Sequence, residues 1–132
     1  MALLLSAFAS GAMAQPAPKY RLELLPSHAD ALYGRAMSIN QSGVVAGTAW
    51  GEGYIRPIVW GRETSLLPLK DPGSDYRCIT VSINDRGWVS GVIEQDDDYR
   101  GYLYQGDKYT VRDRSSRTFE TNNLGIGVGS LR

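Results

Sequence analysis

Three consecutive carboxylates, Asp96 to Asp98, are the first candidates for chemistry in this sequence. Carboxylate oxygens are the ligands that Ca²⁺ prefers, so the run is a candidate metal site. Neighbouring residues of a strand point to opposite faces, however, and no loop of about 12 residues with alternating oxygen ligands surrounds the run. We therefore expect Asp96–Asp98 to form a solvated hairpin tip, and we predict no cofactor.

Two other reactive residue types occur once each. His28 is the only histidine, and Ser27 and Asp30 beside it complete the residue types of a hydrolase triad. Residues so close in sequence rarely reach triad geometry, so we expect a loop histidine. Cys78 is the only cysteine and cannot form an intramolecular disulfide; we expect it to be a small buried residue. The sequence has no G-x-x-x-x-G-K, C-x-x-C or H-E-x-x-H motif.

The charge pattern argues against a nucleic-acid partner, because 14 basic residues balance 14 acidic ones. Nucleic-acid binders usually carry a concentrated basic patch. The nearest approach is the group Arg112, Arg114 and Arg117, which Asp113 interrupts, so we expect a solvated strand end. Aromatic residues are plentiful, and Trp50 and Tyr54 flank a predicted loop. These two would face a ligand such as a glycan, for which nothing else in the sequence provides support.

A ten-residue motif organises the chain. SINQSGVVAG (38–47) returns as SINDRGWVSG (82–91), 44 residues later, and a partial third copy follows 38 residues after the second. Its asparagine can accept a backbone hydrogen bond in an Asx-turn, and the glycine three residues later can supply a positive φ. We therefore expect a hairpin corner in each copy. The structural residues are Asn40, Gly43, Gly47, Asn84, Gly87, Gly91, Asn122, Gly125 and Gly129.

Each period contains about four predicted strands. They cover 44–49, 55–60, 64–67 and 78–83 in the first copy, and 88–94, 99–104 and 109–112 in the second. Residues 20–25 and 36–39 are predicted as the last two strands of an earlier unit, because Leu25-Pro26 echoes Leu67-Pro68. Periods of about 40–45 residues with four strands are typical of propeller blades. The sequence thus predicts an all-β, antiparallel β-repeat fold with propeller-like blades in an incomplete array.

The N-terminus predicts export. An apolar run, 2–9, precedes Ala12-Met13-Ala14, an A-x-A cleavage pattern before Gln15. The run is shorter than the roughly 20 residues that span a bilayer, so no membrane segment is expected after cleavage. No basic residue precedes it; either the free amino group suffices or the true start lies upstream. We predict a signal peptide (1–14), an exposed linker (15–19) and a β-repeat domain (20–132). The domain comprises partial unit 20–39, unit 40–83, unit 84–121 and partial unit 122–132.

The corner and the strand after it resemble a known family. I-N-x-x-G-x-V-x-G is followed by RPIVW (56–60) in one copy and by RGYLY (100–104) in the next. This combination resembles the HAF repeat of extracellular bacterial proteins, and the resemblance covers two full units and parts of two more. It implies a secreted or surface protein of propeller-like β-repeats, found outside the cell or in the periplasm. It transfers no catalytic residue.

These observations favour an exported, non-catalytic β-repeat module that provides a binding or structural surface. Two alternatives stay open. A carbohydrate-active or other hydrolytic propeller enzyme would need two carboxylates that converge in one cleft. A fragment of a longer repeat protein would have no independent activity. Because the outermost units leave open sheet edges, we expect self-association or pairing with another chain.

Overall fold

The computed structural model describes residues 19–67, 77–106, 108–112 and 116–131. The elements in these ranges are all β-strands, which confirms the predicted all-β class. No helix in the described part of the chain is long and apolar enough to cross a membrane. The predicted signal peptide and residues 15–18 of the predicted linker lie outside the described residues. The strands are β1 (Tyr33–Ile39), β2 (Val45–Gly51), β3 (Tyr54–Trp60), β4 (Thr64–Leu66), β5 (Arg77–Ile83), β6 (Val89–Gln95), β7 (Asp98–Tyr104), β8 (Tyr109–Val111), β9 (Ser116–Thr121) and β10 (Gly127–Leu131).

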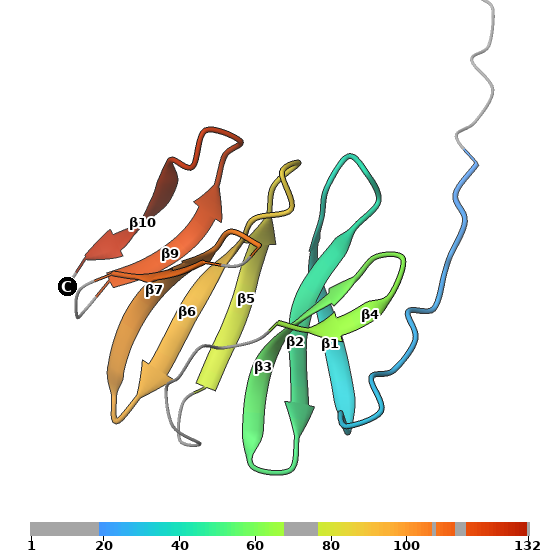
Figure 1. The fold of residues 1–132 in the computed structure, drawn as a ribbon, viewed down its shortest axis with the longest axis horizontal. Helices are drawn as coiled ribbons and strands as arrows, with labels where there is room; N and C mark the ends of the chain where they lie inside the picture. Colours follow the sequence, from blue (N-terminus) through green and yellow to red (C-terminus); the bar gives the residue numbers. More distant parts are fainter. Residues whose placement is uncertain (1–18, 68–76, 107, 113–115, 132) are drawn as a thin grey trace, which may run out of the picture.

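The strands form two antiparallel meanders and a hairpin. Strands β1 to β4 pair in chain order, β5 to β8 do the same, and β9 pairs with β10. A single parallel bridge, Ile55↔Arg77, joins β3 to β5 and makes the two meanders one eight-stranded sheet. Strand β5 pairs with β6 along its length, so the meanders begin one strand earlier than the periods counted from the asparagine. Figure 1 shows the three hairpin corners side by side at the top and the β2–β3 and β6–β7 turns at the bottom.

The first strand of each group carries the same irregularity. The register of β1 against β2 shifts between Ala36 and Ser38, and that of β5 against β6 shifts between Thr80 and Ser82. Strand β9 skips one residue against β10 at the equivalent place, opposite Val128 and Gly129. A bulge bends its strand and increases the local twist, so the same bend precedes each of the three corners.

Two buried clusters lie on opposite faces of β2. Ala46 belongs to a cluster with residues of the second meander, among them Cys78, Ile83 and Tyr102. Ala49 belongs to a second cluster, with Ile58 and Trp60. Strand β5 contacts both β1 and β2, and β9 contacts β5, β6 and β7. The groups therefore stack face to face in chain order, and β1 and β10 lie at opposite ends of the molecule (Figure 1).

The prediction of a strand at 20–25 is wrong. These residues form no strand, and Tyr20, Leu22 and Leu24 are 91%, 94% and 91% exposed. The described residues offer them no neighbouring strand to pair with, and Figure 1 shows the segment leading away from β1. The chain is held from Pro26 onwards, because the Pro26 carbonyl accepts a 2.8 Å hydrogen bond from Trp60 Nε1. The second strand predicted for this unit, 36–39, is confirmed within β1.

Candidate functional site

The three corners have the same backbone geometry. Each asparagine donates its N–H to the carbonyl four residues later, and its carbonyl accepts the N–H of the glycine three residues later, all at 3.0 or 3.1 Å. The three glycines have φ values of 78°, 75° and 81° (Gly43, Gly87 and Gly125). Only glycine adopts this conformation without strain, which explains why it recurs at this position.

The asparagine side chains close these turns and also join each corner to the next. Each Oδ1 accepts the N–H of the residue four positions later, at 2.9 or 3.0 Å. Asn40 Nδ2 donates to the Asn84 carbonyl at 3.1 Å, and Asn84 Nδ2 donates to the Asn122 carbonyl at 2.9 Å. The asparagine side chain therefore links each repeat to the next and also closes its own turn. The sequence predicted the turn but not the bridge.

A second row of bonds runs beside the first. The Gln41 N–H donates to Asp85 Oδ1, and the Asp85 N–H donates to Asn123 Oδ1, both at 2.9 Å. Asn123 Nδ2 returns a bond to Asp85 Oδ2, also at 2.9 Å. The Gln41 amide and the Asn123 side chain together hold the pKa of Asp85 below its usual value. We call the two rows together, which join residues 40–41, 84–85 and 122–123, the corner ladder.

Two hydroxyl groups extend these contacts below the corners. Ser38 Oγ accepts the Ile83 N–H at 3.2 Å, and Thr48 Oγ1 accepts the Thr80 N–H at 2.9 Å. Thr48 and Thr80 are 1% and 0% exposed, so their bond lies between the two meanders. A buried N–H without an acceptor is costly, and these bonds therefore favour one register of the first meander on the second.

The second glycine of the motif is required by close packing. A Cβ at Gly47 would lie 2.0 Å from the Arg35 carbonyl oxygen, and one at Gly91 would lie 2.0 Å from that of Ile79. An aromatic ring also covers each glycine, from Trp60 and Tyr102 respectively. These positions thus need glycine for space, whereas the corner glycines need it for φ.

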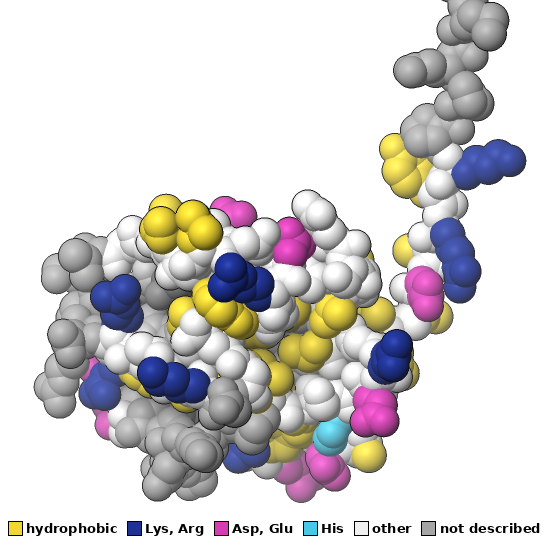
Figure 2. Space-filling view, turned by 45° about the horizontal axis from the view of Figure 1, so that its top comes forward, with side chains coloured by type: hydrophobic (Ala, Val, Ile, Leu, Met, Phe, Trp, Pro, Cys, Tyr) yellow, Lys and Arg dark blue, Asp and Glu magenta, His cyan; other side chains and the backbone are white. Residues whose placement is uncertain are grey.

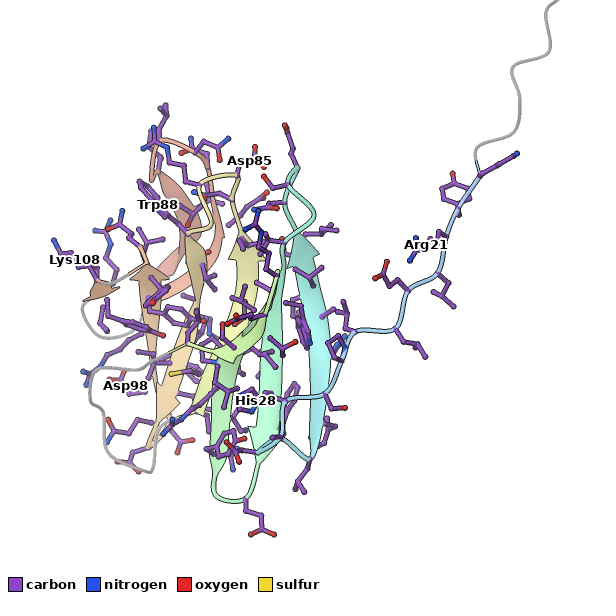
Figure 3. The ribbon with its side chains drawn as sticks, turned by 45° about the vertical axis from the view of Figure 1, so that its right-hand side comes forward. Arg21, His28, Asp85, Trp88, Asp98 and Lys108 are labelled. Carbon is purple, nitrogen blue, oxygen red and sulfur yellow. The ribbon has the colours of Figure 1, made fainter. Side chains whose placement is uncertain are left out.

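The carboxylate run does not converge on one point. Asp96 and Asp97 occupy the β6–β7 turn with φ values of 48° and 62°, and Asp98 begins β7. Asp98 forms an ion pair with Arg100, with 3.2 Å between Oδ2 and Nε. No group of three metal-ligating side chains occurs among the residues that the structure describes. Figure 3 shows Asp98 at the opposite end of the second meander from Asp85.

The two predicted ligand-facing aromatics have internal partners. The Trp50 ring stacks on Tyr33, with 4.8 Å between centroids and 9° between planes. The Tyr54 hydroxyl donates to the Asp30 carbonyl, and Arg56 lies over the Tyr54 ring. Both side chains are half-buried. Trp50 thus packs on the first residue of β1, and Tyr54 fastens the segment before β1 to the β2–β3 hairpin.

The other candidates also have local roles. His28 Nδ1 accepts the Asp30 N–H at 3.2 Å, as in a loop. Cys78 is fully buried, as predicted, and burial raises the pKa of its thiol to about 12. The Arg117 guanidinium lies 4.1 Å from the centroid of the Tyr99 ring. Arg112 is exposed, and Arg114 lies outside the described residues.

Several hollows border the stacked groups, and three of them concern the corners, the C-terminal hairpin and the N-terminal segment. One of about 390 Å³ lies between β7–β8 and β10 and includes Arg112 and Arg117. One of about 490 Å³ lies beneath the corners and includes the carboxylates of Asp85 and Glu120. The third, of about 680 Å³, separates β1 from the segment 21–26. Hydrophobic side chains are visible at the surface beside this segment (Figure 2).

Comparisons with protein-family profiles, with characterised proteins and with solved structures found no match to this chain.

Proposed function

We propose that this chain is an exported, non-catalytic β-repeat module that provides a structural or binding surface. In this proposal the two meanders and the β9–β10 hairpin are propeller-like blades, stacked face to face and joined at their corners. The resemblance of the corner to the HAF repeat and the A-x-A pattern before Gln15 support an extracellular or periplasmic location.

The observation that carries the proposal is the corner ladder. Catalysis requires polar groups that are free to contact a substrate. The recurring polar atoms of the first two corners are instead engaged within the protein; Asn84, for example, uses Oδ1 for its own turn and Nδ2 for the next corner. The motif thus serves the stacking of repeats.

The surface available for binding lies at the other end of the meanders. The β2–β3 turn includes Glu52 and Gly53, and the β6–β7 turn includes Asp96 and Asp97, all four exposed. These turns differ in sequence between copies, whereas the corners keep their asparagine and their glycines. A repeat protein can vary such turns without disturbing the stack, since per-repeat variation maps to loops on one face. We therefore place the variable, ligand-selecting surface there.

The enzyme alternative has one supporting observation, the shared hollow of Asp85 and Glu120. A glycosidase general acid needs a raised pKa, whereas the pKa of Asp85 is lowered by its hydrogen bonds. This favours a structural carboxylate. Hydrolysis of a panel of chromogenic glycosides that is lost in Glu120→Gln would establish the alternative.

The proposal is tested by cooperative unfolding. Because buried contacts join the meanders, Trp60 in the first and the Cys78 thiol in the second should lose their native environments together in urea. The measurements are near-ultraviolet circular dichroism and thiol labelling on the exported chain. Coincident curves are expected. Well-separated transitions would show that the meanders do not act as one module.

A further inference from the structure

The two ends of the stack present complementary groups. In the interior, each corner donates an asparagine Nδ2 and a backbone N–H to the corner that follows it. The last corner holds the same donors, Asn122 Nδ2 and the Asn123 N–H, and no described residue accepts them. The first corner holds the matching acceptors, the Asn40 carbonyl and the Gln41 side-chain oxygen, at the positions of Asn84 and Asp85.

The acceptors beneath the corners are complementary in the same way. Ser130, in the last repeat, is the counterpart of Thr48 in the first. Glu120 is likewise the counterpart of Ser38. Between the first and second meanders, Thr48 and Ser38 accept the N–H groups of Thr80 and Ile83. At the N-terminal end of the stack, Ala36 and Ile39 are the counterparts of Thr80 and Ile83, so their backbone N–H groups are the matching donors.

Apolar residues are exposed at both ends although their interior counterparts are buried. Ile39 is 66% exposed, whereas its counterpart Ile83 is 6% exposed. Val128 is 62% exposed, whereas its counterpart Ser90 is completely buried. We call the surface around Ala36, Met37 and Ile39 the N-end face, and the surface around Asn122, Ile126, Val128 and Ser130 the C-end face.

The segment before β1 leaves the N-end face open. Pro26 holds the Trp60 indole, and residues 21–26 form the far wall of the 680 Å³ hollow next to Met37 and Ile39. Leu67, the counterpart of Leu25, belongs to the buried cluster that covers Tyr104, the counterpart of Trp60. The segment therefore lies where the end of a preceding meander would lie, and the hollow between it and β1 leaves the N-end face open.

We infer that the C-end face of one copy of this chain docks on the N-end face of a second copy and continues the corner ladder across the interface. This inference rests on the proposed function, because it requires propeller-like stacking. A head-to-tail interface forms a ring when its rotation closes. The smallest such ring is a dimer with two equivalent interfaces, and this is the assembly that we infer.

The test is sedimentation equilibrium of the exported chain over a wide range of concentrations. Ile39→Lys places a charge in the N-end face, and Val128→Lys does so in the C-end face. Asn122→Asp removes the Nδ2 donor but keeps the turn acceptor. Each variant should weaken the dimer by at least about tenfold, the effect of losing roughly one hydrogen bond or one apolar contact. The matched control is Val111→Lys, at a 45% exposed position on β8 outside both faces, which should leave the dimer intact.

Mixing the two lysine variants tests the direction of docking. In an equimolar mixture of Ile39→Lys and Val128→Lys, one interface of the heterodimer joins two intact faces and the other carries both lysines. The heterodimer should therefore associate more tightly than either variant does alone. Protection of the Cys78 thiol verifies that each variant is folded.

A monomer at every concentration, or a dimer that none of the three face variants weakens, would overturn the inference. Equal weakening by Val111→Lys, or a mixture that associates no more tightly than either lysine variant alone, would overturn it too. A wild-type monomer that still unfolds in one transition would leave the proposed module in place.

Discussion

Three glycines in different environments, Gly91, Gly87 and Gly61, offer a quantitative test of the packing. Gly91→Ala places a Cβ 2.0 Å from the Ile79 carbonyl oxygen and 2.8 Å from the ring of Tyr102, which is 1% exposed and cannot move aside freely. Strands β5 and β6 would have to separate by about 1 Å, since real contacts of this kind exceed 3 Å. We expect a loss of about 3 kcal/mol or more in the free energy of unfolding.

The two comparison variants separate space from backbone conformation. A Cβ at Gly87 meets nothing within 4 Å, but its φ is 75°, so Gly87→Ala should cost about 1–2 kcal/mol. Gly61 has neither constraint, because its nearest neighbour would be 3.9 Å away. Gly61→Ala should be neutral or stabilise the protein by about 0.4–1 kcal/mol through a less flexible unfolded chain.

Urea unfolding followed by circular dichroism measures all three variants. The order of cost must be Gly91, then Gly87, then Gly61. If Gly91→Ala proved no worse than Gly61→Ala, the close approach of β5 to β6 at this glycine would be refuted.

Three further predictions concern export, alkaline stability and the N-terminal segment. Export should remove residues 1–14 and leave Gln15 first, and mass spectrometry that finds Met1 on the exported chain would contradict this. Because burial raises the pKa of Cys78 from 9.0 to about 12, the unfolded thiol ionises first, so stability should fall by about 1.4 kcal/mol per pH unit as the pH rises above about 9. Cys78→Ala should abolish the loss of stability between about pH 9 and pH 10, where the buried tyrosines do not yet ionise. An unchanged dependence of stability on pH in this variant would exclude the thiol as the cause of the loss. Trp60→Phe removes the donor to the Pro26 carbonyl and should speed amide exchange at Ala31 and Leu32 by about tenfold, whereas unchanged exchange would mean that the indole does not hold the segment.

The sequence predicted the elements that local chemistry determines. The all-β class follows from the alternation of apolar and polar residues, and the corner turns follow from Asx-turn chemistry. The positive φ of Gly43, Gly87 and Gly125 follows from the conformational freedom of glycine. All three are local properties of the chain. The burial of Cys78 followed from its apolar strand neighbours.

What the sequence did not reveal depends on contacts between copies. The same asparagine Oδ1 and Nδ2 atoms serve two neighbours, and only the stacking shows that Nδ2 reaches the next corner. The offset of 44 residues was the available signal, since equivalent positions in stacked repeats become neighbours. The strand expected at 20–25 failed for the opposite reason, because its alternation is local but its partner strand is absent from the described residues.

Amide hydrogen exchange at the three equivalent corner positions tests the central claim most directly. Gln41, Asp85 and Asn123 are all exposed, and the first two amides donate to the next corner. Continuation of the ladder predicts protection of Gln41 and Asp85 at every concentration, and of Asn123 only where two copies are docked. Protection of Asn123 should therefore disappear on dilution. Rapid exchange at Gln41 and Asp85 would contradict the ladder, and rapid exchange at Asn123 at high concentration would contradict its continuation into a second copy.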